Sequence, residues 1–370
     1  MRALPVPCMV VATAVACGSR TGLAVPDHAV SSQERPVALA VSASYTHSCA
    51  LLSDHTVTCW GLNDSGQLGN GSRMTSSTPV AVSGLHDVVS ISAQNGFTCA
   101  LLSAGTVKCW GQIWDASASQ TPVTVPNVTD AIDLGGGDDH MCALLRGGGV
   151  SCWGFFNGAY GWQTVTSAVA LSRGEGSVDC AVLVTGEVAC WGNNYCGEIG
   201  DRTVNDPLRN LPNATIVQGL SNAQDVAVGS YFTCALLTTG VVDCWGSTFG
   251  RAVGACTCFV GPCSEAPFAL TSGAMAVAAG AYRACAVLDS GTIQCWGDNS
   301  HGGLGDGTTV DSGTPVSVSN IANATGVAVG GYHTCALLSD RTVECWGANY
   351  YGQLGNGTTQ DSALPVRVSM

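Results

Sequence analysis

Short runs of apolar residues separated by polar turns recur along most of this 370-residue chain. In the first such unit, the apolar runs cover residues 37–41, 48–52, 56–60 and 79–82. Each run has the length of a β-strand, and short polar or Gly-containing connections join them. The pattern therefore predicts four antiparallel strands in a unit of about 50 residues, with few helices.

The unit occurs seven times, each time with a cysteine, nine further residues, a second cysteine and Trp-Gly. In repeats one to seven the two cysteines are Cys49 and Cys59, Cys99 and Cys109, Cys142 and Cys152, Cys180 and Cys190, Cys234 and Cys244, Cys285 and Cys295, and Cys335 and Cys345. Successive first cysteines lie 38 to 54 residues apart, a period typical of propeller blades or solenoids. Four short strands per repeat match a propeller blade, so we expect an all-β propeller with four-stranded antiparallel blades.

The middle hairpin of each repeat can be placed in register. If Cys49 faces Cys59, the loop between the strands is residues 53–55, and a three-residue loop commonly ends in a left-handed residue within a β-bulge. The third loop position is glycine in five repeats, with His55 and Arg341 as the exceptions. Counting from the turn puts each cysteine pair at a non-hydrogen-bonded position, close enough for a disulfide. Seven cross-strand disulfides, one per blade, are therefore predicted, as in proteins of oxidising compartments.

The aromatic residues fall into two groups. The tryptophan after each second cysteine lies on the other side of its strand from that cysteine, so we expect it to pack between neighbouring blades. A second group lies outside the repeated phrase, in loops of repeats two and three. We interpret its members as candidate binding residues: Trp114, Phe155, Phe156, Tyr160 and Trp162.

Four cysteines outside the repeated pairs are predicted to form further disulfides. Cys196 lies in repeat four, and Cys256, Cys258 and Cys263 lie in an insertion in repeat five. Four cysteines allow three complete pairings, which the sequence leaves open. We expect Cys196 to bond to one of the other three, with a second bridge inside the insertion. A zinc site is disfavoured because Cys256 and Cys258 are separated by one residue, too few for an ordinary structural site.

The first residues predict export. Residues 1–17 read as a signal peptide, residues 18–36 as a flexible tether and residues 37–370 as the repeat domain. Cys17 follows Ala16 as in a bacterial lipobox, in which the cysteine is lipidated. Two outcomes remain open: a lipoprotein of the bacterial outer membrane or cell surface, and a freely secreted protein. The lipid would be the chain's sole membrane attachment.

Charge and motifs exclude several classes of function. The chain has 13 Lys and Arg against 26 Asp and Glu, a formal net charge of −13, which argues against a nucleic-acid partner. His47, His140 and His333 share one repeat position and are interpreted as packing residues, and Asp138-Asp139-His140 as a solvated turn. The signatures of zinc proteases, nucleophile elbows, phosphate loops and calcium loops are missing. We therefore expect no catalytic site, cofactor or metal. We also expect the protein to be a monomer.

Residues 330–338, Gly-Gly-Tyr-His-Thr-Cys-Ala-Leu-Leu, and 343–355, Val-Glu-Cys-Trp-Gly-Ala-Asn-Tyr-Tyr-Gly-Gln-Leu-Gly, carry a family resemblance. They resemble the repeat of the regulator of chromosome condensation family, in a cysteine-rich, exported bacterial form. The resemblance implies a seven-bladed β-propeller. The Gly-Gln-Leu-Gly segment is complete in repeats one and seven, varied in four and six, absent from two and three, and replaced by the insertion in five.

The family includes a nuclear guanine-nucleotide exchange factor and a secreted inhibitor of β-lactamases, but neither activity follows from the fold. Our leading hypothesis is an exported or cell-surface module that binds a protein or glycan partner. The alternatives are an inhibitor of a secreted enzyme, an exchange factor and an enzyme. The resemblance suggests exchange activity, but we expect it least of these alternatives, because an exported chain would not meet a cytoplasmic GTPase.

Overall fold

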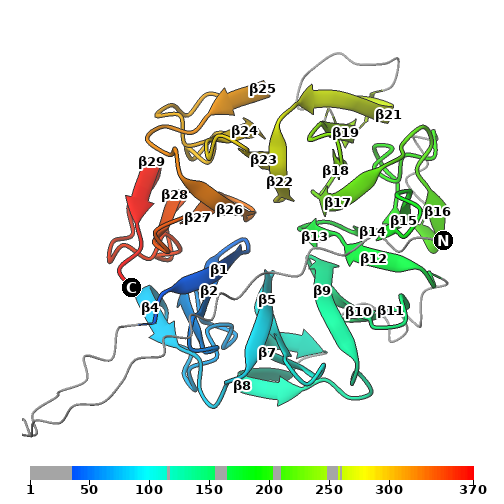
Figure 1. Ribbon diagram of the computed structural model, residues 1–370. Coiled ribbons are helices and arrows are strands. Elements are labelled where there is room, and N and C mark those ends of the chain that lie inside the picture. The colour runs from blue at the N-terminus through cyan, green and yellow to red at the C-terminus, as the bar shows by residue number, and fades with distance from the viewer. Residues whose placement is uncertain (1–35, 115–116, 155–164, 203–209, 248–256, 259–260) are drawn as a thin grey trace, which may run out of the picture. The chain divides into compact units, whose positions relative to one another are not determined.

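The computed structural model describes residues 36–370 except 115–116, 155–164, 203–209, 248–256 and 259–260. The unit Pro36–Met370 is built from β-strands joined by turns and loops (Figure 1). Within the described residues, no helix has the length and apolarity needed to cross a membrane. The expected signal peptide, the tether to residue 35 and Cys17 lie outside the described residues.

Five separate four-stranded sheets, which we call blades, are antiparallel meanders formed by single repeats. Repeat one forms β1 (Ala38–Ala43), β2 (His47–Leu52), β3 (Val57–Gly61) and β4 (Ser76–Ala81). Repeat two forms β5 (Val88–Gln94), β6 (Phe97–Leu102), β7 (Val107–Trp114) and β8 (Ser117–Thr124). Repeat four forms β12 (Ala168–Leu171), β14 (Val178–Leu183), β15 (Val188–Asn193) and β16 (Asn210–Ile216). Repeat six forms β22 (Ala274–Ala279), β23 (Arg283–Leu288), β24 (Ile293–Gly297) and β25 (Ser312–Ser317). Repeat seven forms β26 (Ala324–Val329), β27 (His333–Leu338), β28 (Val343–Gly347) and β29 (Ser362–Arg367).

The expectation of seven separate four-stranded blades is wrong. Repeats three and five share one nine-stranded sheet, in which the short strand β13 pairs in parallel with both β9 and β17. Its strands are β9 (Ala131–Gly137), β10 (His140–Leu145), β11 (Val150–Gly154), β13 (Arg173–Gly174), β17 (Ala223–Val228), β18 (Phe232–Leu237), β19 (Val242–Ser247), β20 (Thr257–Cys258) and β21 (Gly261–Thr271). The described residues therefore hold five blades and one composite sheet.

Glycines explain why these sheets merge. A Cβ atom on Gly174 would overlap the carbonyl oxygen of Val228, and one on Gly137 would overlap that of Gly176. Backbones can approach this closely only where side chains are missing. Repeats three, four and five therefore bring their inner strands near enough for β13, in repeat four, to hydrogen-bond to both neighbours.

The hairpin register is confirmed in all seven repeats. The two cysteines of each repeat face each other across the second and third strands and are bonded, with Cα–Cα distances of 4.0 to 4.1 Å. The bonded pairs are Cys49 with Cys59, Cys99 with Cys109, Cys142 with Cys152, Cys180 with Cys190, Cys234 with Cys244, Cys285 with Cys295, and Cys335 with Cys345. The predicted disulfide of each repeat is therefore present in the structure.

The turn of each hairpin also has the expected conformation. Its third residue is left-handed throughout, with a φ of 62° at His55, 68° at Arg341 and 78° to 81° at the five glycines. Both non-glycine residues accept this conformation, so the turn geometry holds where the glycine is replaced.

The innermost strands contact one another in a closed cycle (Figure 1). β1 contacts β5, and the contacts continue through β9, β12, β17, β22 and β26 back to β1. The final strand, β29, completes the blade of repeat seven by pairing with β28, while β1 pairs with β2. The ring thus closes by packing of the last blade on the first, with Trp60 in one apolar cluster with Leu337 and Leu354.

A recurring hydrogen-bond unit, which we call the latch, joins adjacent repeats. In repeat two, Trp110 Nε1 and Thr98 Oγ1 both donate to the carbonyl of Gln67, at 2.8 and 3.1 Å. Gln67 is the second residue of the Gly-Gln-Leu-Gly segment in repeat one. The same latch has Glu198, Gly303 and Gln353 as acceptors, with Trp245/Thr233, Trp346/Thr334 and Trp60/Ser48 as donors. The prediction that these tryptophans pack between blades is confirmed.

Three tryptophans lie where the preceding repeat lacks this segment. The indole N–H groups of Trp153, Trp191 and Trp296 are buried without a hydrogen-bond partner among the described residues. They belong to repeats three, four and six, which follow repeats two, three and five. Loss of the Gly-Gln-Leu-Gly segment therefore removes the acceptor for the next repeat's tryptophan.

Candidate binding face

Strand order determines which loops lie together. In an antiparallel meander, the inner loops, which join strands one and two, and the outer loops, which join strands three and four, leave at the same end of the blade, because strand direction alternates. We call this end the loop face, and the opposite end, with the three-residue turns such as residues 53–55, the turn face.

Four tyrosines form a continuous arc on the loop face. They are Tyr45, Tyr332, Tyr282 and Tyr231, in repeats one, seven, six and five. Ring centroids lie 5.8 Å apart for Tyr45 and Tyr332, 6.4 Å for Tyr332 and Tyr282, and 6.5 Å for Tyr282 and Tyr231. Such spacings are typical of interacting aromatic side chains. Tyr282 and Tyr332 remain 38% and 37% exposed, so the tyrosine arc presents aromatic surface to solvent.

The arc continues outward over the loops of repeats six and seven. The His301 ring lies 5.7 Å from that of Tyr332 and 5.4 Å from that of Tyr350, edge-on to both. His301 Nδ1 is also 3.0 Å from the Tyr350 hydroxyl and 3.2 Å from a carboxylate oxygen of Asp361. Tyr350 is 59% exposed, which places a further aromatic ring at the surface.

Tyr45 marks the inner end of the arc, beside two acidic residues. Burial, together with the charges of Glu175 and Asp138, raises the pKa of the Tyr45 hydroxyl. Burial and then the charge of Asp138 raise the pKa of Glu175 well above its usual value, although Arg283 opposes the shift. Burial and the neighbouring Asp139 raise the pKa of Asp138 to about 6. Buried carboxyls brought this close carry fewer charges at neutral pH than two exposed ones.

Several loops of the loop face carry acidic but no basic residues, although the outer loop of repeat one contains Arg73. Residues 298–311 and 348–361, the outer loops of repeats six and seven, contain Asp298, Asp306, Asp311 and Asp361 and no Lys or Arg. In the inner loops of all seven repeats, outside β13, the acidic residues are Asp138, Asp139 and Glu175, and Lys and Arg are again missing. Arg283, at the start of β23, is fully buried and donates to the carbonyls of Gly330 and Gly331.

Two of the three equivalent histidines extend the latch. His47 Nε2 lies 2.7 Å from Thr98 Oγ1, and His333 Nε2 lies 2.6 Å from Ser48 Oγ. Each ring therefore joins its own repeat to the hydroxyl that the next repeat uses in its latch. Burial lowers the pKa of His47 and of His333 to about 3, so both rings are neutral. The interpretation as packing residues holds, with an inter-repeat hydrogen bond added.

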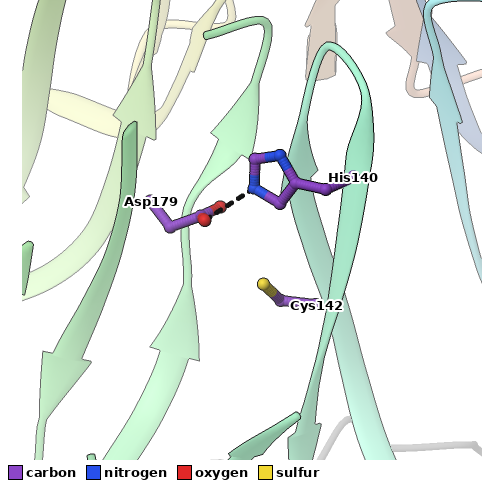
Figure 2. Close-up of side chains that lie close together, drawn as sticks. All are labelled: His140, Cys142 and Asp179. Atoms are coloured by element: carbon purple, nitrogen blue, oxygen red, sulfur yellow. Dashed lines mark hydrogen bonds and ion pairs between the residues drawn. The ribbon is translucent and has the colours of Figure 1, made fainter. Parts of the chain in front are cut away.

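His140 makes an ion pair instead. Its Nε2 lies 2.6 Å from a carboxylate oxygen of Asp179 in repeat four (Figure 2). Burial lowers the pKa of His140 most strongly, but the charge of Asp179 and the hydrogen bonds with Asp139 and Asp179 together raise it to about 10. Asp138-Asp139-His140, interpreted from sequence as a solvated turn, thus contains a buried charged histidine that sequence reasoning missed.

The same residues contain potential metal ligands. Ligand atoms of His140, Cys142 and Asp179 all lie within 4.8 Å of one another. Cys142, however, is bonded to Cys152, and a thiolate rather than a disulfide sulfur is the ligand that metals bind. With the disulfide intact, the residues fit an inter-repeat ion pair better than a metal centre.

A cavity of about 190 Å³ lies between the inner strands. Small residues such as Ala40, Ala43 and Ala279 line much of it, together with Arg173 and Asp225. Arg173 is paired with Asp133 and therefore offers little free charge to a ligand.

Of the five aromatic residues predicted to bind, Trp114 falls within the described residues. Trp114 ends β7, with its backbone paired to Ser117, whereas Phe155, Phe156, Tyr160 and Trp162 lie outside the described residues. Cys196 is buried in the loop after β15, and its bonding to Cys256, Cys258 or Cys263 stays a prediction.

The tyrosine arc was missed in the sequence, although a signal was present. Tyr231, Tyr282 and Tyr332 all lie three residues before the first cysteine of their repeats, and Tyr45 lies four before. The signal is this run of tyrosines in consecutive repeats, directly before the position that holds His333 in repeat seven.

Comparisons with known proteins give relatives and fold neighbours. The chain is 31% identical over 150 residues to the human E3 ubiquitin-protein ligase HERC2, covering 40% of this chain and 3% of that ligase. Human WBSCR16 superposes with a TM-score of 0.72 at 19% identity, over 85% of this chain and 94% of that one. Prp20p from Saccharomyces cerevisiae, whose binding to Gsp1p and histones has been described, has a TM-score of 0.52 at 20% identity, over 90% and 76%. The last two likenesses establish the propeller fold.

Two sequence profiles of the regulator of chromosome condensation (RCC1) repeat match the chain. One matches residues 39–67, 223–249, 276–302 and 324–353, and the other residues 54–101, 290–337 and 343–370. Together the matches cover half of the chain, and the latches and disulfides lie in the same repeated frame. The protein belongs to the family with regulator of chromosome condensation repeats, as an all-β propeller stapled by disulfides.

Proposed function

We propose that the protein is an exported, non-enzymatic module that binds a protein partner through its loop face. The observation that carries this proposal is the tyrosine arc, which offers exposed aromatic rings on a scaffold held by disulfides and latches. Tyrosine provides large contact area at low entropic cost and is enriched at binding hot spots. Support from relatives is coarser: a propeller neighbour, Prp20p, binds Gsp1p and histones.

Export is part of the proposal. Seven disulfides are typical of proteins from oxidising compartments, and residues 1–17 have the composition of a signal peptide. Lipidation at Cys17 or free secretion would both place the propeller outside the cytoplasm, at the bacterial surface or beyond it.

Inhibition of a secreted enzyme is the second candidate function. It requires a compact group of aromatic anchors, and the arc with His301 and Tyr350 is such a group. The two functions differ in the partner, since an inhibitor would capture an enzyme and reduce its activity.

The test is affinity capture from the host envelope and culture supernatant, with the propeller as bait. We expect one enriched protein for the wild type and little for Tyr282→Ala/Tyr332→Ala. The matched control is Val184→Ala, which changes a side chain that is 72% exposed on the turn face and should capture normally. Equal capture by all three baits would refute the loop face as the binding surface. Assaying the captured protein for inhibition then separates the two functions.

A further inference from the structure

A small pocket opens on the loop face between repeats two and three. It has a volume of about 170 Å³ and is lined by Asn95, Phe97, Gln112, Asp138 and Asp139. The lining residues thus include two with carboxylates, two with side-chain amides and one that is apolar, around a space large enough for the end of a side chain.

The acidic side of this pocket is incompletely satisfied. Asp138 Oδ1 is buried without a hydrogen-bond partner among the described residues. Close by, outside the pocket lining, Glu175 is 1% exposed, and burial and the charge of Asp138 raise its pKa. The Asp138 amide donates to the carbonyl of Gly176 at 3.4 Å, which holds the two acidic loops together. Buried acceptors without donors are costly, so a ligand with several N–H donors would gain by binding here.

We propose that this pocket receives the ammonium group of a lysine side chain from the protein partner. The inference rests on the proposed function, because the tyrosine arc would hold the rest of that partner. An ammonium has three donors and no acceptor, which matches the oxygens of Asp138, Asp139, Asn95 and Gln112. A guanidinium is wider and planar, and needs a flat pair of acceptors.

Charge complementarity supports a basic occupant. The inner loops carry Asp138, Asp139 and Glu175 and, outside β13, no Lys or Arg, and the chain has a formal net charge of −13. The titratable groups that act on Asp138 are Asp139, His140 and Tyr45, and Asp138 acts in turn on Glu175, which Arg283 also affects with opposite sign. His140 is engaged by Asp179 and, at 3.2 Å, by a carboxylate oxygen of Asp139. Asp138 is therefore the carboxylate of the pocket that is left for an external cation.

The test uses fluorescence anisotropy with a labelled tetralysine peptide, its Nε-acetylated form and a tetra-arginine peptide, all against the intact protein. Asp138→Asn should weaken tetralysine binding by roughly 10-fold, the loss expected for a charge-assisted hydrogen bond. Asp289→Asn makes the same change in net charge on the turn face and should have little effect. The acetylated peptide should not bind, and tetra-arginine should bind more weakly than tetralysine.

The pH dependence gives a second readout. Because the pKa of Asp138 is about 6, wild-type affinity for tetralysine should rise between pH 5 and pH 7 as this carboxyl ionises. Asp138→Asn should lose that rise. Circular dichroism of both variants checks that the fold is retained.

Several results would overturn the proposal. Equal losses in Asp138→Asn and Asp289→Asn would show diffuse attraction by net charge, and binding of the acetylated peptide would show contacts that need no ammonium. Failure of wild type to bind tetralysine at millimolar concentration would also overturn it, as would tighter binding of tetra-arginine. Partner capture that still depends on Tyr282 and Tyr332 would leave the proposed function standing in each case.

Discussion

The latch predicts that two equally buried tryptophans respond differently to the same substitution. Trp346 and Trp296 are both 0% exposed and occupy the same repeat position. Trp346 donates to the carbonyl of Gly303 at 2.9 Å, whereas the Trp296 indole N–H has no partner among the described residues. Changing each to phenylalanine removes the same atoms, so the costs of lost volume largely cancel in the comparison.

The remaining difference comes from the indole N–H. Trp346→Phe loses a hydrogen bond with a net value of about 1 kcal/mol, while Thr334 Oγ1 still donates to the Gly303 carbonyl at 3.0 Å. Trp296→Phe removes a buried, unsatisfied donor, which relieves about 1 to 3 kcal/mol. Trp346→Phe should therefore lower the free energy of unfolding by about 2 to 4 kcal/mol more than Trp296→Phe.

The assay is guanidinium unfolding followed by far-ultraviolet circular dichroism, with disulfides intact. If the two variants share the wild-type m-value, the midpoints convert directly into free-energy differences. Thr334→Val/Trp346→Phe adds a check, because the Gly303 carbonyl then loses both donors and the loss should exceed the sum of the single changes. Equal destabilisation of Trp346→Phe and Trp296→Phe would refute the latch as a stabilising unit.

Three further predictions follow from named contacts. Gly69→Ala should lower the free energy of unfolding by at least about 2 kcal/mol more than Gly84→Ala in guanidinium unfolding. Both residues have φ near +65°, but only at Gly69 would the new Cβ lie 2.7 Å from Trp110 Nε1, so similar losses would contradict this prediction. The pKa of His140 is raised from 6.5 to about 10, so its ion pair stabilises the fold fully below pH 6.5, and this contribution is lost as the pH rises through 10. The free energy of unfolding of the wild type should therefore decline between pH 6 and 10. A similar decline in Asp179→Asn would count against the ion pair as its cause. Peptide mapping under non-reducing conditions should find Cys196 bonded to Cys256, Cys258 or Cys263, and an alkylated Cys196 thiol would contradict that pairing.

Much of the fold was predictable because the repeat supplies independent checks. The register of Cys49 opposite Cys59 determined the turn, and the turn required a left-handed third residue, which His55 and Arg341 adopt although neither is glycine. Strand number per blade and disulfide positions followed from the same register. Local geometry was readable because each rule was tested seven times.

The merged sheet was not predictable in the same way. Gly135, Gly136 and Gly137 are visible in the sequence, but whether a bare backbone approaches Ser172, Gly176 or solvent depends on how neighbouring repeats pack. Periodicity within one repeat carries no information on that distance. The count of seven separate blades failed for this reason.

The candidate site was missed because it joins residues from different repeats. Tyr45 lies beside Tyr332, 287 positions later in the chain, and Asp138 lies close to Glu175. The aromatic residues chosen from sequence were the irregular ones, such as Trp114, while the arc uses a regular repeat position. A residue type that recurs at one repeat position was interpreted as a packing residue, although the inner loops of a propeller both recur in every repeat and are exposed.

The most direct measurement of the central claim is hydrogen–deuterium exchange of the propeller with and without its captured partner. Binding through the loop face predicts protection at residues 44–46, 230–232, 281–283 and 331–333, with the three-residue turns such as 53–55 unchanged. Protection confined to those turns would place the partner on the opposite end of the blades and contradict the account.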